Sequence, residues 1–311
     1  MGIDDVIQAM EGDSMKKNRR MQASAFICRG AVTPLLIFAF ASRILVHAQT
    51  GGSGEPQVIT SGRPLDLAAD LLQGRYGKPV TYEDPIWMWG GDVEPNARGN
   101  ALWPRDRSFS LPVETRLDQA QIDDAALLGK VLQAYHQQTD GPVFRIAQSR
   151  WGLHILPAQA RNGAGQFVSV KSMLDAHIDV PVANRTPFGH FQAICAAVTD
   201  SVGIKLEPFS PSLNRLFAPN GIRPPKVLTD KDEEQISFAW GATGLIAREA
   251  VISLLDQSST TLTWKVLCQA GEVSCVFSLM PIQLTVVGAG REMIKKSLSY
   301  DRCVKCPQLP K

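Results

Sequence analysis

Cysteines near the end of the sequence are the residues whose spacing most directly predicts chemistry. Cys268 and Cys275 stand on either side of Gly271-Glu272. If Gly271 and Glu272 form the tight turn of a β-hairpin, the two cysteines lie directly opposite each other on neighbouring strands. Opposed positions bring two thiols within bridging range, so we predict a disulfide between Cys268 and Cys275.

Cys303 and Cys306 are a second closely spaced pair, in the segment Cys-Val-Lys-Cys-Pro. The spacing suits a small disulfide, half of a metal site or a redox pair. A redox pair of this spacing opens a helix in a βαβ context, which the residues after Cys303 do not provide. We interpret the pair as a structural disulfide candidate, and a four-cysteine metal site shared with the first pair stays open. Cys195 falls on an apolar helix face and is predicted to be a core residue.

Asp175, His177 and Asp179 alternate along a predicted strand, 173–182, and would share one face of it. Carboxylates and imidazole are ligands for divalent metals, so the trio is the first candidate for a metal-dependent site. Apolar residues occupy the other face. A half-buried strand with one wet polar face gives the same pattern, and we favour that interpretation, which predicts no metal ligand.

A long insertion at 84–112 carries three tryptophans and several prolines. Trp87, Trp89 and Trp103, with Arg105 close by, are the residue types that binding hot spots favour. They therefore predict a recognition surface for a protein, a glycan or a peptide. The alternative is that the tryptophans fold back over the core, because tryptophan is usually largely buried. The sequence leaves both interpretations open.

No serine, cysteine or lysine nucleophile lies in a recognised local signature, and no glycine-rich loop ends in Gly-Lys-Ser/Thr. The segment 284–290, LTVVGAG, begins like a dinucleotide fingerprint, but Met293 stands where the third glycine belongs. We therefore predict no catalytic residue and no cofactor. Catalytic groups can also be scattered along a chain, so a secreted hydrolase or metal-dependent enzyme with a site between modules remains the alternative.

Three stretches with a common pattern would position these residues, at 63–83, 185–207 and 247–267. Each has apolar residues at steps of three and four, then a polar or glycine break, then alternating apolar residues. A helix with one apolar face needs a sheet to cover it. We interpret each stretch as part of a β-α-β unit, and whether the units are true internal repeats stays open. The predicted fold class is α+β, with helices packed on short mixed sheets in two or three small modules.

The predicted organisation follows from these units and the breaks between them. It consists of a signal peptide (1–48), a first α+β domain (56–160) containing the insertion (84–112), a second β-α-β module (161–208), a Pro-rich linker (209–234), a third β-α-β module (235–287) and a cysteine-containing tail (288–311). Within the first domain, residues 123–139 are predicted to form a second helix.

The N-terminal segment has the pattern of an export signal. Four basic residues at 16–20 precede the apolar run 31–41, which is too short to span a bilayer. Small residues at Val46 and Ala48 predict cleavage after Ala48. An uncleaved anchor is the alternative, and the start codon stays open between Met1, Met15 and Met21. Export predicts a periplasmic or secreted protein, in which disulfides are permitted.

Charge argues against one class of partner. The leader holds six of the 32 basic residues and four of the 30 acidic residues, so the mature chain keeps 26 of each. Phosphate contacts supply most of the affinity for nucleic acids, and a neutral chain without a basic stripe is poorly suited to make them. We expect no nucleic-acid partner, and contact with the membrane only through the leader.

The stretches RPLDLAADLLQGRYGKPVTYE and AREAVISLLDQSSTTLTWKVL resemble the small β-α-β modules of the secretin and TonB-receptor short N-terminal (STN) domain. The resemblance covers about 20 residues per copy and rests on hydrophobic spacing. It implies a periplasmic module that docks proteins or builds assemblies and is not an enzyme; it carries over no functional residue. We therefore expect an exported, non-catalytic envelope protein that binds a partner, most simply another envelope protein, through sheet edges or through the insertion.

Overall fold

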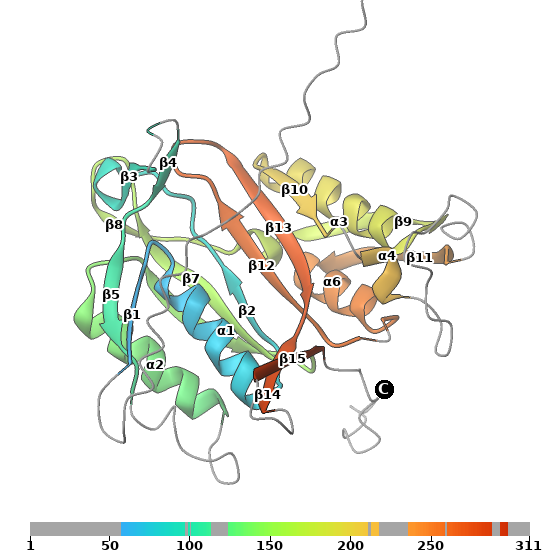
Figure 1. Ribbon diagram of the computed structural model, residues 1–311. Helices are drawn as coiled ribbons and strands as arrows, with labels where there is room; N and C mark the ends of the chain where they lie inside the picture. The colour runs from blue at the N-terminus through green and yellow to red at the C-terminus, as the bar shows by residue number, and fades with distance from the viewer. Residues whose placement is uncertain are drawn as a thin grey trace, which may run out of the picture. The chain divides into compact units, whose positions relative to one another are not determined.

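The computed structural model describes residues 57–96, 99, 101–112, 124–210, 213–217, 236–258, 260–287 and 293–297 (Figure 1). The predicted signal peptide, most of the predicted linker, and Cys303 and Cys306 lie outside these residues. No helix in the part that is described is long and apolar enough to cross a membrane.

Helices and strands are both abundant, which confirms the predicted α+β class. Within the described residues, the α-helices are α1 (Pro64–Tyr76), α2 (Asp124–Gln138), α3 (Pro187–Val202), α4 (Leu213–Leu216) and α6 (Ala247–Leu255). The short 3-10 helices described are η2 (Gly90–Asp92) and η4 (Met173–Asp175).

A seven-stranded mixed sheet organises the fold, in the order β10-β13-β12-β2-β7-β6, with β8 also pairing with β7. Its strands are β2 (Val80–Glu83), β6 (Val143–Gln148), β7 (Leu153–Arg161), β8 (Phe167–Ser169), β10 (Lys205–Phe209), β12 (Leu262–Cys268) and β13 (Ser274–Pro281). The pairs β10/β13, β12/β2 and β2/β7 are parallel, and the others are antiparallel.

The remaining strands form antiparallel pairs outside this sheet. They are β1 (Val58–Ser61) with β5 (Arg107–Ser110), β3 (Val93–Pro95) with β4 (Leu102–Pro104), β9 (His177–Arg185) with β11 (Phe238–Ile246), and β14 (Gln283–Val287) with β15 (Met293–Ser297).

The three expected helix–strand stretches are present as β1-α1-β2, β9-α3-β10 and β11-α6-β12. In each unit the first strand lies in a two-stranded sheet and the second strand lies in the seven-stranded sheet. The second and third units also pair with each other, because β9 and β11 form one sheet and α3 contacts α6. Strands from all three predicted modules therefore meet in one sheet. The predicted boundary at 160/161 lies within β7, and the one at 208/209 lies within β10.

The ends of the helices follow from local sequence. Pro64 begins α1, where no N–H is required, and Gly77 ends it with a left-handed φ of 67° and an N–H bonded to the carbonyl of Gln73. Thr186 caps α3 by accepting the N–H of Gly189. These signals mark the ends of α1 and the start of α3.

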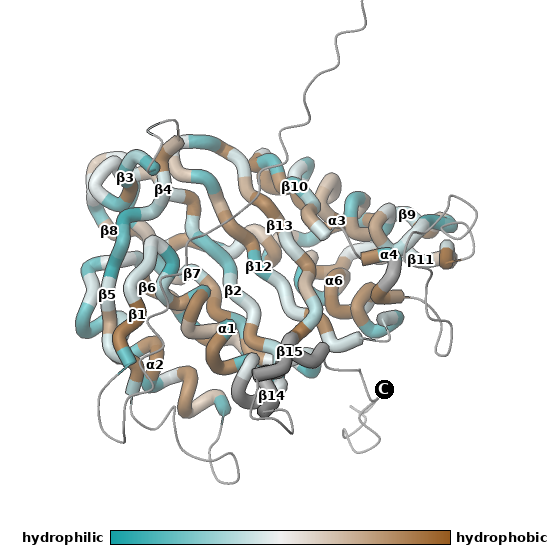
Figure 2. The backbone as a smooth tube through the Cα atoms, viewed as in Figure 1, coloured by the Kyte–Doolittle hydropathy of each residue, from teal (hydrophilic) through white to brown (hydrophobic). Residues whose placement is uncertain are grey.

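Two apolar clusters form the core. One lies around α1 and α2 and includes Leu65, Leu128 and Ile155. The other lies around α3, α6, β12 and β13 and includes Phe191 and Trp264. Figure 2 shows hydrophobic segments along α1 and α6.

Candidate functional site

The predicted recognition residues of the insertion do not share one surface. Trp87 is 6% exposed and belongs to the apolar core, so the fold-back interpretation holds for this residue. Trp89 is half-buried, whereas Trp103 is 38% exposed and Arg105 is exposed. The structure therefore separates one core tryptophan from two that reach the surface.

Trp89 forms one side of an aromatic sandwich around Arg161. The Arg161 guanidinium lies 4.5 Å from the Trp89 ring centroid and 4.6 Å from that of Phe167. It also donates to Asp92 at 2.8 Å, and Asp92 pairs with Arg107 at 2.5 Å. This arrangement fixes the insertion to β7 and β8, so Trp89 has a structural role.

Replacing Trp89 with alanine is expected to lower the free energy of unfolding by about 1–2 kcal/mol, because a partly buried cation–π contact is lost. Urea denaturation measures the change. Met88→Ala is the matched control: Met88 is 65% exposed and next to Trp89, so we expect a change within about 0.5 kcal/mol. Equal losses in the two variants would contradict the structural role of Trp89.

Trp103 lies beside the turn between β12 and β13. The guanidinium of Arg63 stacks on its ring at 5.6 Å. The neighbouring Leu102 forms an isolated β-bridge with Ala270, in the turn itself. The close approach requires Gly271, since a Cβ there would lie 3.0 Å from Leu102 Cδ1 and its φ is 77°. Figure 1 shows β4 next to the β12–β13 turn.

The same turn carries the disulfide between Cys268 and Cys275, which face each other in the β12–β13 register. Both cysteines are fully buried. Cys195 is a free, buried thiol on α3. Burial raises the pKa of the Cys195 thiol, so it stays protonated and unreactive at neutral pH.

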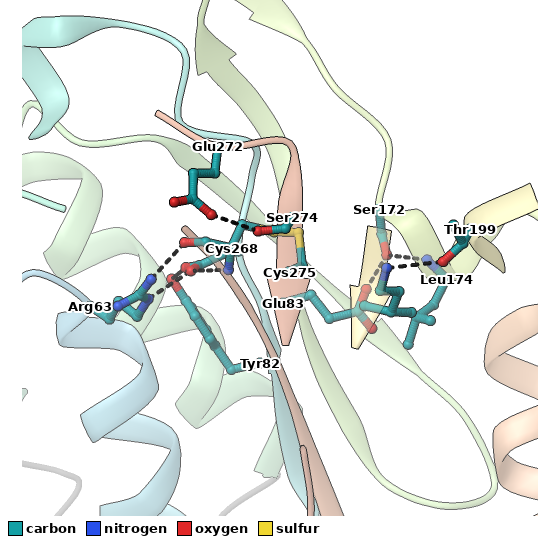
Figure 3. Close-up of a disulfide and its surroundings, with 12 residues drawn as sticks. Arg63, Tyr82, Glu83, Ser172, Leu174, Thr199, Cys268, Glu272, Ser274 and Cys275 are labelled. Atoms are coloured by element: carbon teal, nitrogen blue, oxygen red, sulfur yellow. Dashed lines mark hydrogen bonds and ion pairs between the residues drawn. A yellow bond between two sulfur atoms is a disulfide. The ribbon is translucent and has the colours of Figure 1, made fainter. Parts of the chain in front are cut away.

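A buried carboxylate, Asp84, connects Cys268 to Arg63, the N-cap of α1. Figure 3 shows Arg63 and Tyr82 near Cys268. Asp84 accepts Arg63 Nε at 2.6 Å, the hydroxyl of Tyr82 at 2.7 Å and the backbone N–H of Cys268 at 3.0 Å. Arg63 Nη2 also donates to the carbonyl of Cys268 at 2.8 Å. Burial, together with the Asp84 carboxylate, raises the pKa of Tyr82, so its phenol remains a donor.

The metal-site alternative, Asp175, His177 and Asp179, is not assembled as one face of a strand. Asp175 ends η4, and β9 begins only at His177, because Ser172 caps η4 by accepting the N–H of Leu174. Asp175 forms an ion pair with Arg248, and Asp179 accepts the N–H of Gly244. Among the described residues, no three His, Cys, Asp or Glu side chains are grouped to hold a metal ion.

A buried ionic cluster that the sequence did not indicate surrounds Glu83, the last residue of β2, which is 1% exposed. Arg248 Nη2 donates to both carboxylate oxygens, at 3.2 and 3.1 Å. Ser172 Oγ and Trp264 Nε1 also donate to Glu83, and Arg248 Nη1 pairs with Asp175. The only sequence signal was a glutamate at the end of a short predicted strand.

A second missed cluster resembles a nucleophile–base chain. His154 Nε2 lies 2.8 Å from Ser149 Oγ, and His154 Nδ1 lies 2.9 Å from Thr81 Oγ1. Burial lowers the pKa of His154 to about 3, which makes it a weak base, and its ring stacks on Trp264. Ser149 Oγ already accepts the N–H of Trp151. We assign the cluster to structure rather than to catalysis.

β10 and β6, the first and last strands in the order of the large sheet, each have a backbone N–H bonded to a side chain. On β10, the N–H of Leu206 is bonded to Thr199 Oγ1 at 3.0 Å, and Pro208 has no N–H. On β6, the N–H of Phe144 is bonded to His136 Nε2 at 3.0 Å. Such edges resist the addition of a strand, so docking through β6 or β10 is disfavoured.

Comparisons with known proteins give no assignment: no family model matches the chain, and neither a curated protein nor a solved structure is found to be similar. The resemblance to the STN domain therefore stays an expectation from the sequence.

Proposed function

We propose that this protein is an exported, non-catalytic binding module that docks a partner protein of the cell envelope. The docking site is a surface formed by Leu102, Trp103, Arg105 and Val273, called here the ribbon–turn surface. The observation that carries the proposal is the exposure of three large apolar side chains, Leu102 at 43%, Trp103 at 38% and Val273 at 65%. They lie on the β3–β4 ribbon and on the β12–β13 turn, which the Leu102–Ala270 bridge joins.

The ribbon–turn surface is held in place before any partner binds. The Arg63 guanidinium lies over the Trp103 ring. Asp84 accepts hydrogen bonds from both Arg63 and the backbone N–H of Cys268, which holds them in place. The disulfide closes the β12–β13 end next to it. Side chains that are already ordered lose little entropy on association, which favours affinity.

The chemistry of the surface suits a protein better than a glycan. Leu102 and Val273 provide aliphatic contact area and no hydrogen bond from their side chains. Tryptophan and arginine are enriched at protein interfaces, and the buried centre of an interface is more apolar than its rim. The capped edges of β6 and β10 favour the same surface, because they leave less opportunity for docking by strand addition. The disulfide is consistent with an oxidising compartment.

Site-specific photo-cross-linking in the native host tests this function. A photoreactive residue at Leu102 or at Val273 is expected to capture the same protein. The same residue at Val58, which is 59% exposed on β1, is expected not to capture it. Mass spectrometry identifies each adduct.

Trp103→Ala should reduce the Leu102 and Val273 adducts by at least about tenfold, since a central hot-spot side chain contributes about 2 kcal/mol or more. Arg105→Ala should weaken them less, because an exposed charged side chain contributes less than a large aromatic one. The proposal fails if adducts at Val58 match those at Leu102 and Val273. It also fails if Trp103→Ala changes nothing, or if the captured species is a glycan.

A further inference from the structure

We propose that the Cys268–Cys275 disulfide controls the ribbon–turn surface, so that the protein docks its partner only after these two cysteines are oxidised. This inference rests on the proposed function and adds its regulation. It follows from contacts that lead from the disulfide to the exposed side chains of the ribbon, one step at a time.

The first step joins the disulfide to a buried ion pair. The backbone of Cys268 uses both of its polar groups here: its N–H donates to Asp84 Oδ2 at 3.0 Å and its carbonyl accepts Arg63 Nη2 at 2.8 Å. Arg63 and Asp84 are themselves paired at 2.6 Å, with side-chain exposures of 12% and 0%. The position of the Cys268 peptide therefore sets the position of the Arg63 guanidinium (Figure 3).

The second step joins Arg63 and the turn to the ribbon. Arg63 stacks on Trp103, and Leu102 forms its bridge with Ala270, two residues after Cys268. The pairing of β12 with β13 ends at the two cysteines, followed by one bond from Gln269 N–H to the carbonyl of Ser274. The Lys205 N–H also donates to the carbonyl of Val273 at 3.2 Å, and Ser274 Oγ donates to Glu272 Oε2 at 3.2 Å. The disulfide is the covalent tie at this end of the hairpin, and without it the turn that supports Leu102 opens more often.

The chemistry is a two-electron oxidation. The two thiols lose two electrons and two protons to a disulfide of a thiol-oxidising partner protein, whose disulfide becomes a dithiol. Both cysteines are fully buried, so a folded, oxidised chain protects the bond from reductants in solution. The surface is therefore completed when the chain folds in an oxidising compartment, and a chain kept in a reducing compartment lacks it.

The test compares the native protein with the Cys268→Ser/Cys275→Ser variant. In hydrogen exchange, the amides at 101–105 and 269–274 are expected to exchange about ten- to a hundredfold faster in the variant. This is the range expected when loop closure by a short disulfide is lost. Amides of α2, in the other core cluster, serve as the internal control and should be unchanged. Acrylamide should quench tryptophan fluorescence more strongly in the variant.

A second variant keeps the test decisive if the double variant does not fold. Arg63→Lys retains the charge opposite Asp84 and leaves the disulfide intact, but it loses the planar group that stacks on Trp103 and reaches the Cys268 carbonyl. We expect faster exchange at 101–105 in this variant too. Unchanged exchange at 101–105 in Arg63→Lys and in any folded double variant overturns the proposal.

The photo-cross-linking result separates this inference from the proposed function. If exchange at 101–105 rises and the Leu102 adduct disappears in the double variant, the proposal is supported. If the native, oxidised protein gives no adduct at Leu102, the proposed function fails. Oxidation then affects only how fast the amides at 101–105 exchange. An adduct of equal yield from oxidised and reduced chains overturns the inference and leaves the proposed function intact.

Discussion

Replacing Arg248 with methionine is expected to lower the free energy of unfolding by about 3–5 kcal/mol, the usual cost of removing one partner from a buried ion pair. Arg248 donates to both oxygens of Glu83, which is 1% exposed and covered by Trp264. Methionine fills a similar volume but leaves the Glu83 carboxylate buried without its cation. Urea or thermal denaturation of the purified protein measures the loss.

Arg145→Met is the matched control for this prediction. Arg145 pairs with the same Asp175 as Arg248 does, at 3.1 Å, but its side chain is 48% exposed and it does not contact Glu83. An exposed pair contributes about 0–1 kcal/mol, so this variant should change stability little. Equal losses for the two variants would contradict the importance of Glu83.

The double variant Glu83→Leu/Arg248→Met should be more stable than Arg248→Met alone. It removes the uncompensated charge and replaces the pair with apolar side chains, an exchange that is often neutral. The coupling between the two positions is then measured by the double-mutant cycle. A double variant that loses the sum of the two single losses would show that Glu83 and Arg248 act independently.

A fall in pH is expected to destabilise the protein strongly through His154. Burial lowers the pKa of His154 to about 3 in the folded chain, whereas an unfolded histidine has a pKa of about 6.5. Between these values the unfolded chain binds more protons, so stability is complete above about pH 6.5 and is lost as the pH falls toward 3. At about 1.4 kcal/mol per pH unit, the whole window corresponds to about 5 kcal/mol.

Protonation of Asp66 has the opposite effect on stability as the pH falls, so its contribution must be distinguished from that of His154. Burial raises the pKa of Asp66 to about 6, despite its ion pair with Lys265 at 2.5 Å. Its protonation therefore favours the folded chain as the pH falls from about 6 to 4.

The measurement is the pH dependence of the free energy of unfolding, from pH 7.5 to 4, in the native protein and in His154→Gln.

We expect His154→Gln to have a flatter pH dependence, because the contribution with the large pKa shift is removed. The opposing contribution of Asp66 remains, as do those of His136 and His190, whose pKa values burial also lowers. Asp66→Asn should show a steeper acid loss than the native protein, because its opposing contribution is removed. Parallel pH profiles for the native protein and His154→Gln would show that His154 does not carry the acid sensitivity.

The sequence by itself determined the local elements and the disulfide. Apolar residues at steps of three and four, such as Leu65, Ala68 and Leu72, marked the buried face of α1, and Pro64 and Gly77 marked its ends. The opposed positions of Cys268 and Cys275 followed from one tight turn. These features depend on residues close together in the chain, so their spacing carries the information.

Only the tertiary structure decided which polar residues meet and which tryptophans reach solvent. Glu83 and Arg248 are 165 positions apart, and Arg63 reaches Cys268 across 205 positions. Trp87 and Trp103 belong to one insertion, yet one is in the core and the other lies on the surface. Local spacing predicts that a face is apolar or polar, but the order of strands in the sheet determines what covers it. The sequence therefore predicted a set of residue types, and the packing of β4 against the β12–β13 turn decided which exposed side chains lie together in the proposed surface.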